Sequence, residues 1–215
     1  MMDFGLVGFS GKMGKVINET FAERDYRMVL KVDGSTRSVD GIPKVIIDFS
    51  RPEALPQTID LCVRYSSPLV IGTTGLDEDE FKKLKELSKV VPIVQSYNFS
   101  IGITLMIKML EEFSSKLSDW DVEIVETHHV HKKDSPSGTA IMLRNAIKND
   151  VKIHSIRIGG IPGDHAVIFA NDGEVFEISH RAISRRAFSL GVLRASEWII
   201  DKKPDFYKFS DVIYG

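Results

Sequence analysis

The sequence predicts an α/β fold of two domains, one with a parallel sheet and one with an open sheet of mixed or antiparallel strands. Up to about position 100, short apolar runs alternate with segments of helical periodicity, and repeated β-α-β units produce a parallel sheet with helices on both faces. Beyond that point, three strand-like runs follow one another across turn sequences such as Asn171-Asp172-Gly173, which is typical of an antiparallel sheet. The change of pattern indicates a second domain of the α+β type.

The first domain is expected to contain five strands separated by helices. Apolar residues recur at helical spacing over 13–21, and in LDEDEFKKLKEL acidic residues precede lysines, which suits the dipole of a helix beginning near Asp77. Ser50 and Glu53 have the spacing of a capping box, so we expect a helix there with an irregular first turn at Pro56. The strands are expected at 4–7, 26–32, 45–49, 69–71 and 91–94.

The second domain is expected to begin with a helix over 101–117 and to end before a long helix over 185–200. That last helix and a strand over 207–213 are expected to pack back on the first domain. We therefore assign 1–99 and 184–215 to the first domain and 100–183 to the second. Inside the second domain we expect strands at 122–127, 152–158, 166–170 and 175–179, and a helix over 137–148.

Composition narrows the class of protein. Hydrophobic residues are 43% and charged residues 27% of the chain, which is an ordinary globular balance. The net charge of −2 argues against nucleic-acid binding through bulk charge. The lone Cys62 excludes an intrachain disulfide, and no apolar run approaches the ~20 residues that span a bilayer. With no signal peptide in the N-terminal sequence, we expect a soluble, cytoplasmic protein without a membrane partner.

A glycine-rich turn follows the first expected strand and precedes the first expected helix. Gly8, Gly11 and Gly14 in GLVGFSGKMG allow tight turning and close approach of backbone N–H groups to a pyrophosphate. Ser10 stands where the usual pattern has its second glycine, but Asp33 ends the second strand at about the distance expected for an acid that binds a ribose hydroxyl. These features predict a Rossmann-like dinucleotide site, with contacts at Gly8, Phe9, Ser10, Gly11, Lys12, Met13 and Asp33.

Two further loops are expected at the same edge of the parallel sheet. One follows the strand at 69–71 and the other follows the strand at 91–94. Ligands of open α/β sheets bind at the carboxyl ends of the strands, although either loop alone is also compatible with a plain turn. We interpret them as a ledge for the nicotinamide, with contacts at Gly72, Thr73, Thr74, Ser96, Tyr97, Asn98 and Phe99.

The segment HHVHKKDSPSGTA, at 128–140, offers a different chemistry. Its second half opens a helix, whose N-terminal N–H groups and dipole can hold a carboxylate; Ser137, Gly138 and Thr139 are the candidates. Its first half carries three histidines, and His129 and His131 would share a face in an extended chain, as metal ligands do. The neighbouring lysines repel a cation and no third ligand is evident, so we expect no metal. A polar turn without chemistry remains the alternative.

Together these segments resemble the dihydrodipicolinate reductase (4-hydroxy-tetrahydrodipicolinate reductase) family of lysine and diaminopimelate biosynthesis. The resemblance runs nearly end to end, through VGFSGKMG, DFSRPE, GTTG, the NFS at 98–100, ETHHVHKKDSPSGTA and HRAISRRAF. It implies reduction of a cyclic, unsaturated imine dicarboxylate by NADH or NADPH. It also implies a central α+β domain that binds substrate and forms a homotetramer.

The resemblance also implies residue roles in the histidine segment. His128 corresponds to the general acid/base, Lys132 to the proton donor and His129 to a substrate-binding position. Histidine suits proton transfer near neutrality, and a lysine ammonium stabilises negative charge. Cofactor choice stays open, because Asp33 would repel a 2′-phosphate whereas Arg37 would attract it.

Other functions remain as alternatives. The chain could be another two-domain NAD(P)-dependent dehydrogenase acting on a small amino or dicarboxylic acid, a non-catalytic NAD(H)-binding redox sensor, or a metal-dependent hydrolase. The roles of His131, Arg181 and Arg185 are also open: the two arginines contact substrate, brace the domain junction or form ordinary surface ion pairs.

Overall fold

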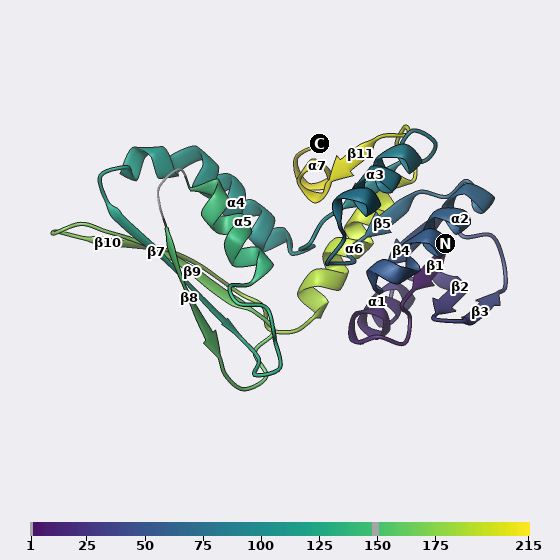
Figure 1. The fold of residues 1–215 in the computed structure, drawn as a ribbon, viewed down its shortest axis with the longest axis horizontal. Coiled ribbons are helices and arrows are strands. Elements are labelled where there is room, and N and C mark those ends of the chain that lie inside the picture. The colour runs from purple at the N-terminus through teal and green to yellow at the C-terminus, as the bar shows by residue number, and fades with distance from the viewer. Residues whose placement is uncertain (1, 148–150) are drawn as a thin grey trace. The chain divides into compact units, whose positions relative to one another are not determined.

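A computed structural model describes residues 2–147 and 151–215 of the chain. The chain divides into two compact units, one formed up to Phe99 together with Phe188–Gly215 and the other by Ser100–Ala187 (Figure 1). The return to the first unit therefore falls between 187 and 188, a few positions later than the 183/184 boundary that the sequence suggested. Among the described residues, every helix is too short or too polar to cross a bilayer.

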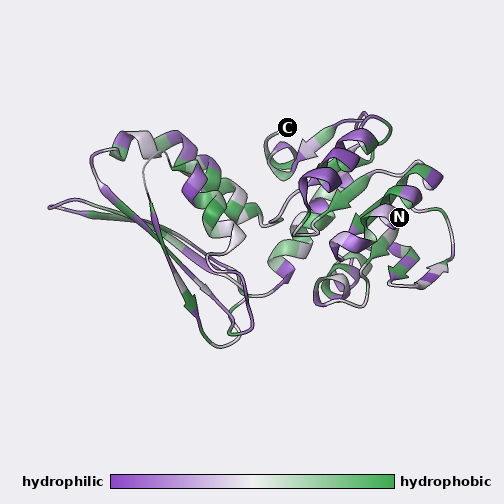
Figure 2. Cartoon of the chain, viewed as in Figure 1, coloured by the Kyte–Doolittle hydropathy of each residue, from purple (hydrophilic) through white to green (hydrophobic). Residues whose placement is uncertain are grey.

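The first unit contains a seven-stranded sheet in the order β11-β6-β5-β4-β1-β2-β3. All neighbouring strands run parallel except β3, which pairs antiparallel with β2 at one edge. The predicted parallel α/β sheet is thus confirmed, and its central strands β4 and β5 are mostly hydrophobic in Figure 2. The strands are β1 (Asp3–Val7), β2 (Arg27–Asp33), β3 (Thr36–Val39), β4 (Val45–Asp48), β5 (Leu69–Ile71), β6 (Ile93–Gln95) and β11 (Phe206–Lys208).

Helices pack on this sheet, and two of them, α6 and α7, come from the C-terminal part of the chain. Helix α6 packs so closely against the chain at Phe99 that a Cβ on Gly191 would overlap the Phe99 carbonyl oxygen. The loop that ends at Phe99 is therefore fixed by a helix that lies about 90 residues away in the sequence. The helices are α1 (Lys12–Ala22), α2 (Leu55–Tyr65), α3 (Glu78–Leu87), α6 (Arg186–Ile199) and α7 (Phe209–Tyr214).

Two local predictions for this unit were wrong. The strand expected over 207–213 ends at Lys208 and gives way to α7, because Asp211 accepts the Lys208 N–H at 2.7 Å and so caps a helical turn. The capping box expected at Ser50 is absent as well. The Ser50 hydroxyl donates to Asp48 instead, and a short 3-10 helix over Pro52–Ala54 precedes α2.

The second unit contains a four-stranded mixed sheet in the order β10-β9-β7-β8. Strand β7 pairs parallel with β8 and antiparallel with β9, so the predicted open mixed sheet is confirmed. The helix expected over 137–148 is observed as far as Ala146, and position 148 lies outside the described residues. The elements are α4 (Ile101–Phe113), a 3-10 helix (Ser114–Leu117), β7 (Asp121–His128), α5 (Gly138–Ala146), β8 (Lys152–Arg157), β9 (Asp164–Ala170) and β10 (Val175–Arg181).

Helices α4 and α5 cover one face of this sheet (Figure 1). Along β7 the buried positions are the even-numbered ones, from Val122 to His128, as the period of two in a strand requires. Glu126 and His128 therefore point to the helix side, where the apolar core of the unit lies. A carboxylate and an imidazole at such positions require hydrogen-bond partners, and those partners form the candidate site.

Candidate active site

The glycine-rich turn after β1 has the geometry of an anion cradle. Gly8 has a φ of +84°, which favours glycine, and a Cβ on Gly14 would overlap the Gly8 carbonyl oxygen. Helix α1 begins directly after Gly11, whose N-cap position supplies no side-chain cap. The N-terminal end of α1 is thus available to a pyrophosphate, and the residues fit a dinucleotide. Lys12 is exposed and Met13 and Phe9 are half-buried at the same turn.

Ser10, at the position of the usual second glycine, connects the glycine-rich turn to β2. Its hydroxyl donates a hydrogen bond to the carboxylate of Asp33, at the carboxyl end of β2. The unpredicted strand β3 brings Arg37 opposite Val32 in the antiparallel register, and its guanidinium lies 3.4 Å from the Tyr65 hydroxyl. A carboxylate and a guanidinium therefore lie on adjacent strands at the edge where the adenosine ribose is expected.

A buried carboxylate, Asp48, joins the loops after β4 and β5. Its Oδ1 accepts the Ser50 N–H at 3.0 Å and the Thr73 hydroxyl at 2.8 Å, and its Oδ2 accepts the Thr58 hydroxyl at 2.6 Å. Burial raises the pKa of Asp48, and the hydrogen bonds partly offset that rise. Sequence reasoning passed over this residue, although an acid at the end of an apolar strand was a visible signal.

The residues expected at the nicotinamide divide into supporting and accessible ones. Thr73 and Phe99 are buried, and the Phe99 ring packs at 5.5 Å from that of Phe49. Ser96 and Asn98 close their own turn, since the Ser96 hydroxyl donates to the Asn98 carbonyl at 2.7 Å. Gly72 lies against the Phe49 ring, with no room for a Cβ. The remaining two, Thr74 and Tyr97, are exposed.

At the end of β7, His128 is anchored by Glu126. The Nδ1 atom of His128 hydrogen-bonds Oε2 of Glu126, and both side chains are buried. The Nε2 atom faces Gly163, where a Cβ would lie 3.0 Å away. The glycine therefore leaves room for the ring.

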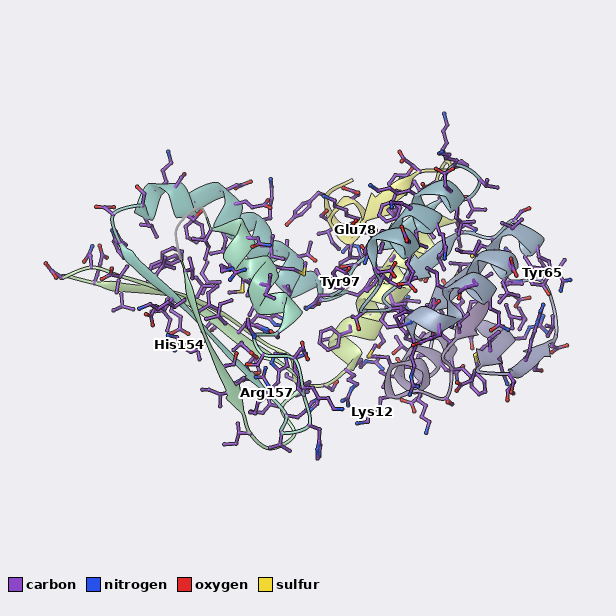
Figure 3. The ribbon with its side chains drawn as sticks, in the orientation of Figure 1. Lys12, Tyr65, Glu78, Tyr97, His154 and Arg157 are labelled. Atoms are coloured by element: carbon purple, nitrogen blue, oxygen red, sulfur yellow. The ribbon has the colours of Figure 1, made fainter. Side chains whose placement is uncertain are left out.

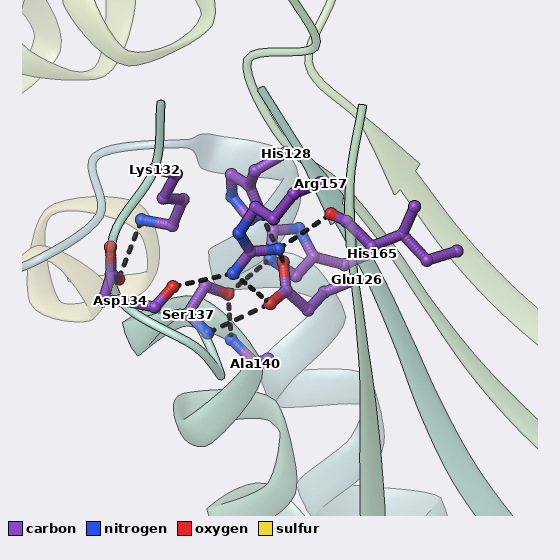
Figure 4. Close-up of polar contacts among 9 residues, drawn as sticks. Glu126, His128, Lys132, Asp134, Ser137, Ala140, Arg157 and His165 are labelled. Atoms are coloured by element: carbon purple, nitrogen blue, oxygen red, sulfur yellow. Dashed lines mark hydrogen bonds and ion pairs between the residues drawn. The ribbon is translucent and has the colours of Figure 1, made fainter. Parts of the chain in front are cut away.

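Arg157 of β8 completes this arrangement (Figure 4). Its guanidinium donates to both oxygens of Glu126, at 3.0 and 2.8 Å, and also to the Asp134 carbonyl at 2.7 Å. The Ser137 N–H donates to Glu126 as well, at 3.2 Å. Sequence reasoning did not assign a role to Glu126 or Arg157. The pattern Glu126-x-His128 in a strand was a signal for the first, whereas nothing in the sequence indicated the second.

The charges of this cluster follow from its contacts. Burial opposes ionisation of Glu126, but hydrogen bonds from Arg157, Ser155 and His128 outweigh it and lower the pKa to about 2. Burial lowers the pKa of His128, and the Glu126 carboxylate only partly restores it. Burial, with help from His128, lowers the pKa of His165 to about 3. The cluster thus holds an ionised carboxylate beside two imidazoles that are biased towards the neutral form.

The other predicted residues surround this cluster. The Lys132 ammonium pairs with Asp134 at 2.8 Å and its side chain is 23% exposed, so it remains accessible. His129 is half-buried and His131 is exposed, with their rings 6.2 Å apart.

Helix α5 begins beside the same cluster. The Ser137 hydroxyl caps the helix by accepting the Ala140 N–H at 3.2 Å, and it also lies 3.3 Å from Nε2 of His165. Gly138 is exposed, with nothing within 4 Å of its Cβ position, and Thr139 is half-buried. Of the three residues expected in the carboxylate cradle, Ser137 is thus engaged within the protein, and Gly138 presents the open surface.

Glu126, His128 and His165 also meet the distance criterion for a metal site. Their potential ligand atoms lie within 4.8 Å of one another. Both carboxylate oxygens, however, already accept hydrogen bonds from Arg157, and its positive charge opposes a cation. The chemistry of this donor set fits a hydrogen-bond network better than a metal centre.

Of the two open arginines, the structure gives a partner to Arg181. Its Nε atom donates to Asp164 at 2.7 Å, and 79% of its side chain is exposed. Of the roles considered for Arg181, this contact corresponds to the ordinary surface ion pair. Arg185, in the chain segment that joins β10 to α6, is half-buried.

Comparison with known proteins gives the chain two matches to family models. Residues 30–99 match the N-terminal part of dihydrodipicolinate reductase, and residues 102–213 match its C-terminal part. Two curated relatives carry the name 4-hydroxy-tetrahydrodipicolinate reductase. The protein from Thermosipho africanus is 54% identical over 99% of this chain and 98% of its own length. The protein from Caldanaerobacter subterraneus is 38% identical over 96% of each chain.

Solved structures show the same fold. A dipicolinate-bound dihydrodipicolinate reductase from Paenisporosarcina sp. TG-14 superposes with a TM-score of 0.80 at 23% identity, covering 97% of each chain. A probable dehydrogenase from Thermotoga maritima superposes with a TM-score of 0.65 at 9% identity, covering 99% of this chain and 93% of its own. The architecture is therefore shared with dehydrogenases that have little sequence in common with this chain.

We predict that Asp48→Asn lowers the free energy of unfolding by about 2 kcal/mol, because the new amide group meets hydroxyl and N–H donors in a buried site. Release of the loops at Ser50 and Thr73 should also weaken NADH binding. Denaturant unfolding and fluorescence titration measure the two effects. The exposed Asp60→Asn, on α2, is the control, and unchanged NADH affinity in Asp48→Asn would show that the loops do not depend on the tether.

Proposed function

The chain belongs to the dihydrodipicolinate reductase family, and from this premise we infer that it reduces 4-hydroxy-tetrahydrodipicolinate to tetrahydrodipicolinate. It is a pyridine nucleotide-dependent oxidoreductase of lysine and diaminopimelate biosynthesis. The observation that carries this assignment is the identity of 54% over 99% of the chain. We propose the cytoplasm as its location, because the pool of reduced nicotinamide cofactor for biosynthesis lies there.

We propose a division of labour between the two units. The first would hold the cofactor, through the turn at Gly8 and Gly14, Asp33, and the loops that Asp48 joins. The second would hold the substrate, which carries two carboxylates, near the start of α5 and Lys132. The bound cofactor supplies a hydride, and loss of one water with gain of that hydride and one proton balances the reaction.

Within the second unit, the residues would handle charge and the proton. The Lys132 ammonium would donate the proton to the reduced substrate and offset its negative charge. Gly138 allows a carboxylate to approach the positive end of α5. His128, biased towards its neutral form by burial, would accept and return a proton through Nε2. His129 and Thr139 would also contact the substrate.

We predict that His128→Gln and Lys132→Ala each lower kcat by roughly 10²- to 10⁴-fold, the usual contribution of a positioned acid or base. NADH affinity should change little, because both residues belong to the proposed substrate unit. Steady-state kinetics with substrate generated in situ, run with NADH and NADPH in parallel, and NADH titration test this. The exposed Lys133→Ala is the matched control. Unchanged turnover in both variants would contradict the roles, and an inactive native protein would contradict the function.

We propose that Asp33 and Arg37 together set the choice between the two cofactors. The Asp33 carboxylate favours a ribose 2′-hydroxyl and repels a 2′-phosphate, whereas Arg37 on the adjacent strand favours the phosphate. Asp33→Ala should therefore raise the ratio of kcat/KM for NADPH to that for NADH by about tenfold, or roughly 1.4 kcal/mol. Asp40→Ala, at the end of the same hairpin, is the control. A ratio that falls or stays constant would contradict the proposed role of Asp33.

We propose a homotetramer that forms through the face of the second sheet opposite α4 and α5. No element of the described part of this unit covers that face. It carries exposed apolar side chains, Ile156 at 46% and Val175 at 68%; His154 lies on it too (Figure 3). Exposed apolar surface of this kind is typical of interfaces.

Ile156→Glu should therefore dissociate the assembly, since it would bury an unpaired charge. Light scattering after size exclusion should give a native mass four times the chain mass of 24.1 kDa and a smaller mass for the variant. Val63→Glu, at an exposed position of α2, is the control. A monomeric native protein, or a variant that remains a tetramer, would contradict this interface.

A further inference from the structure

We propose that Glu126 is a positioning residue that holds His128 in the tautomer with its proton on Nδ1, and that Arg157 keeps Glu126 in place for this task. The inference rests on the proposed function of His128 as the acid/base. It concerns two residues behind the reacting groups, which act through His128.

Several hydrogen bonds fix the Glu126 carboxylate. Its side chain is completely buried, and it accepts from the two terminal nitrogens of Arg157, the Ser137 N–H and His128. These donors occupy both oxygens in fixed directions. A bidentate guanidinium pair of this kind restricts a carboxylate more than a single point charge does. The oxygen facing His128 therefore has little freedom to turn away.

The Glu126 carboxylate also determines where the proton of the neutral His128 ring lies. Because Glu126 is ionised, it can only accept, so the hydrogen between it and His128 must be on Nδ1. In the neutral ring, Nε2 then carries the lone pair. That nitrogen faces the space that Gly163 leaves open. The carboxylate thus decides which nitrogen of His128 exchanges protons.

The Glu126–Arg157 ion pair also contacts the loop that carries Lys132. Arg157 also donates to the Asp134 carbonyl, and Asp134 in turn pairs with the Lys132 ammonium. Glu126 contacts the first residue of the α5 cap, Ser137, through its N–H. One ion pair therefore positions the histidine, the lysine loop and the start of α5 together.

Several charged or titratable groups face His128 and influence its pH dependence. Glu126 raises its pKa, while Lys132 and Arg157 lower it, and burial lowers it most. Asp134 interacts with it from the lysine loop, and the His165 ring lies 5.2 Å away on β9. Removing the charge of Glu126 removes a stabilising interaction with protonated His128. The His128 limb of the pH profile must therefore move to lower pH.

Glu126→Gln is the direct test, because it keeps the shape and removes the charge. We expect kcat to fall at least roughly 10- to 100-fold, the loss that is typical when a carboxylate orienting a metal-bound histidine is removed. The His128 limb of kcat/KM should move to lower pH. A variant that loses activity with an unmoved limb, or keeps full activity, would overturn the proposal.

Glu123→Gln is the matched control. Glu123 lies on the same strand, and its carboxylate contacts Nε2 of His154 at 2.7 Å, but this pair lies on the opposite face of the sheet, the face proposed to form the tetramer. The same substitution in a similar carboxylate–imidazole pair should leave kcat and the pH profile within about twofold of the native values. Light scattering on both variants tests whether each keeps the native oligomeric state.

A measurement on the native protein covers the case in which Glu126→Gln does not fold. In protein labelled with ¹⁵N-histidine, the six imidazoles report their tautomers through long-range ¹H–¹⁵N spectra, and the spectrum of His128→Gln assigns the signal of His128. We expect neutral His128 to carry its proton on Nδ1. A proton on Nε2 would overturn the proposal. This result does not depend on turnover, so it separates failure of this inference from failure of the proposed reaction.

Discussion

The polar site of the second unit depends on one ion pair, between the buried Glu126 and the half-buried Arg157. The pairing of β7 with β8 puts both residues on the sheet face that α4 and α5 cover, where an isolated charge is strongly disfavoured. Loss of one partner in such a pair costs about 3–5 kcal/mol, because the remaining charge is left buried. The carboxylate accepts hydrogen bonds from donors on β7, on β8 and at the start of α5. Its neighbours are thereby fixed in position as well.

The histidine segment that looks uniform in sequence separates into different environments in the fold. His128 is the last residue of β7 and points to the helix side, where it is buried, whereas His131 lies in the exposed turn beyond the strand. The period of two in the strand joins His128 to Glu126 and not to the other histidines of the segment. The imidazole that lies near His128 comes from His165 on β9. The spacing of His129 and His131, which suggested a metal site, therefore does not correspond to the side chains that lie together in the fold.

Periodic features were predictable from the sequence, and long-range partners were not. The parallel strands, the glycine turn and the helix that opens at Ser137 follow from local patterns, so the sheet classes and this helix were predicted. The strand β3 was missed because its four residues are all exposed and only Val39 among them is apolar. The helix α7 was read as a strand because its six residues are too few to define a helical period. Arg157 could not be identified, since its partnership with Glu126 depends on the pairing of β7 with β8.

Two buried carboxylates at or near the ends of strands show how the donors determine the function of an acid. Asp48 is surrounded by hydroxyl and N–H groups, which are neutral, and its pKa is raised by burial. Glu126 is equally buried, but a guanidinium contacts both its oxygens and its pKa is lowered to about 2. Neutral donors suffice for a tether between loops, which needs geometry alone. A carboxylate that must orient and polarise an imidazole has to stay ionised in the interior, and a fixed positive charge beside it meets that requirement.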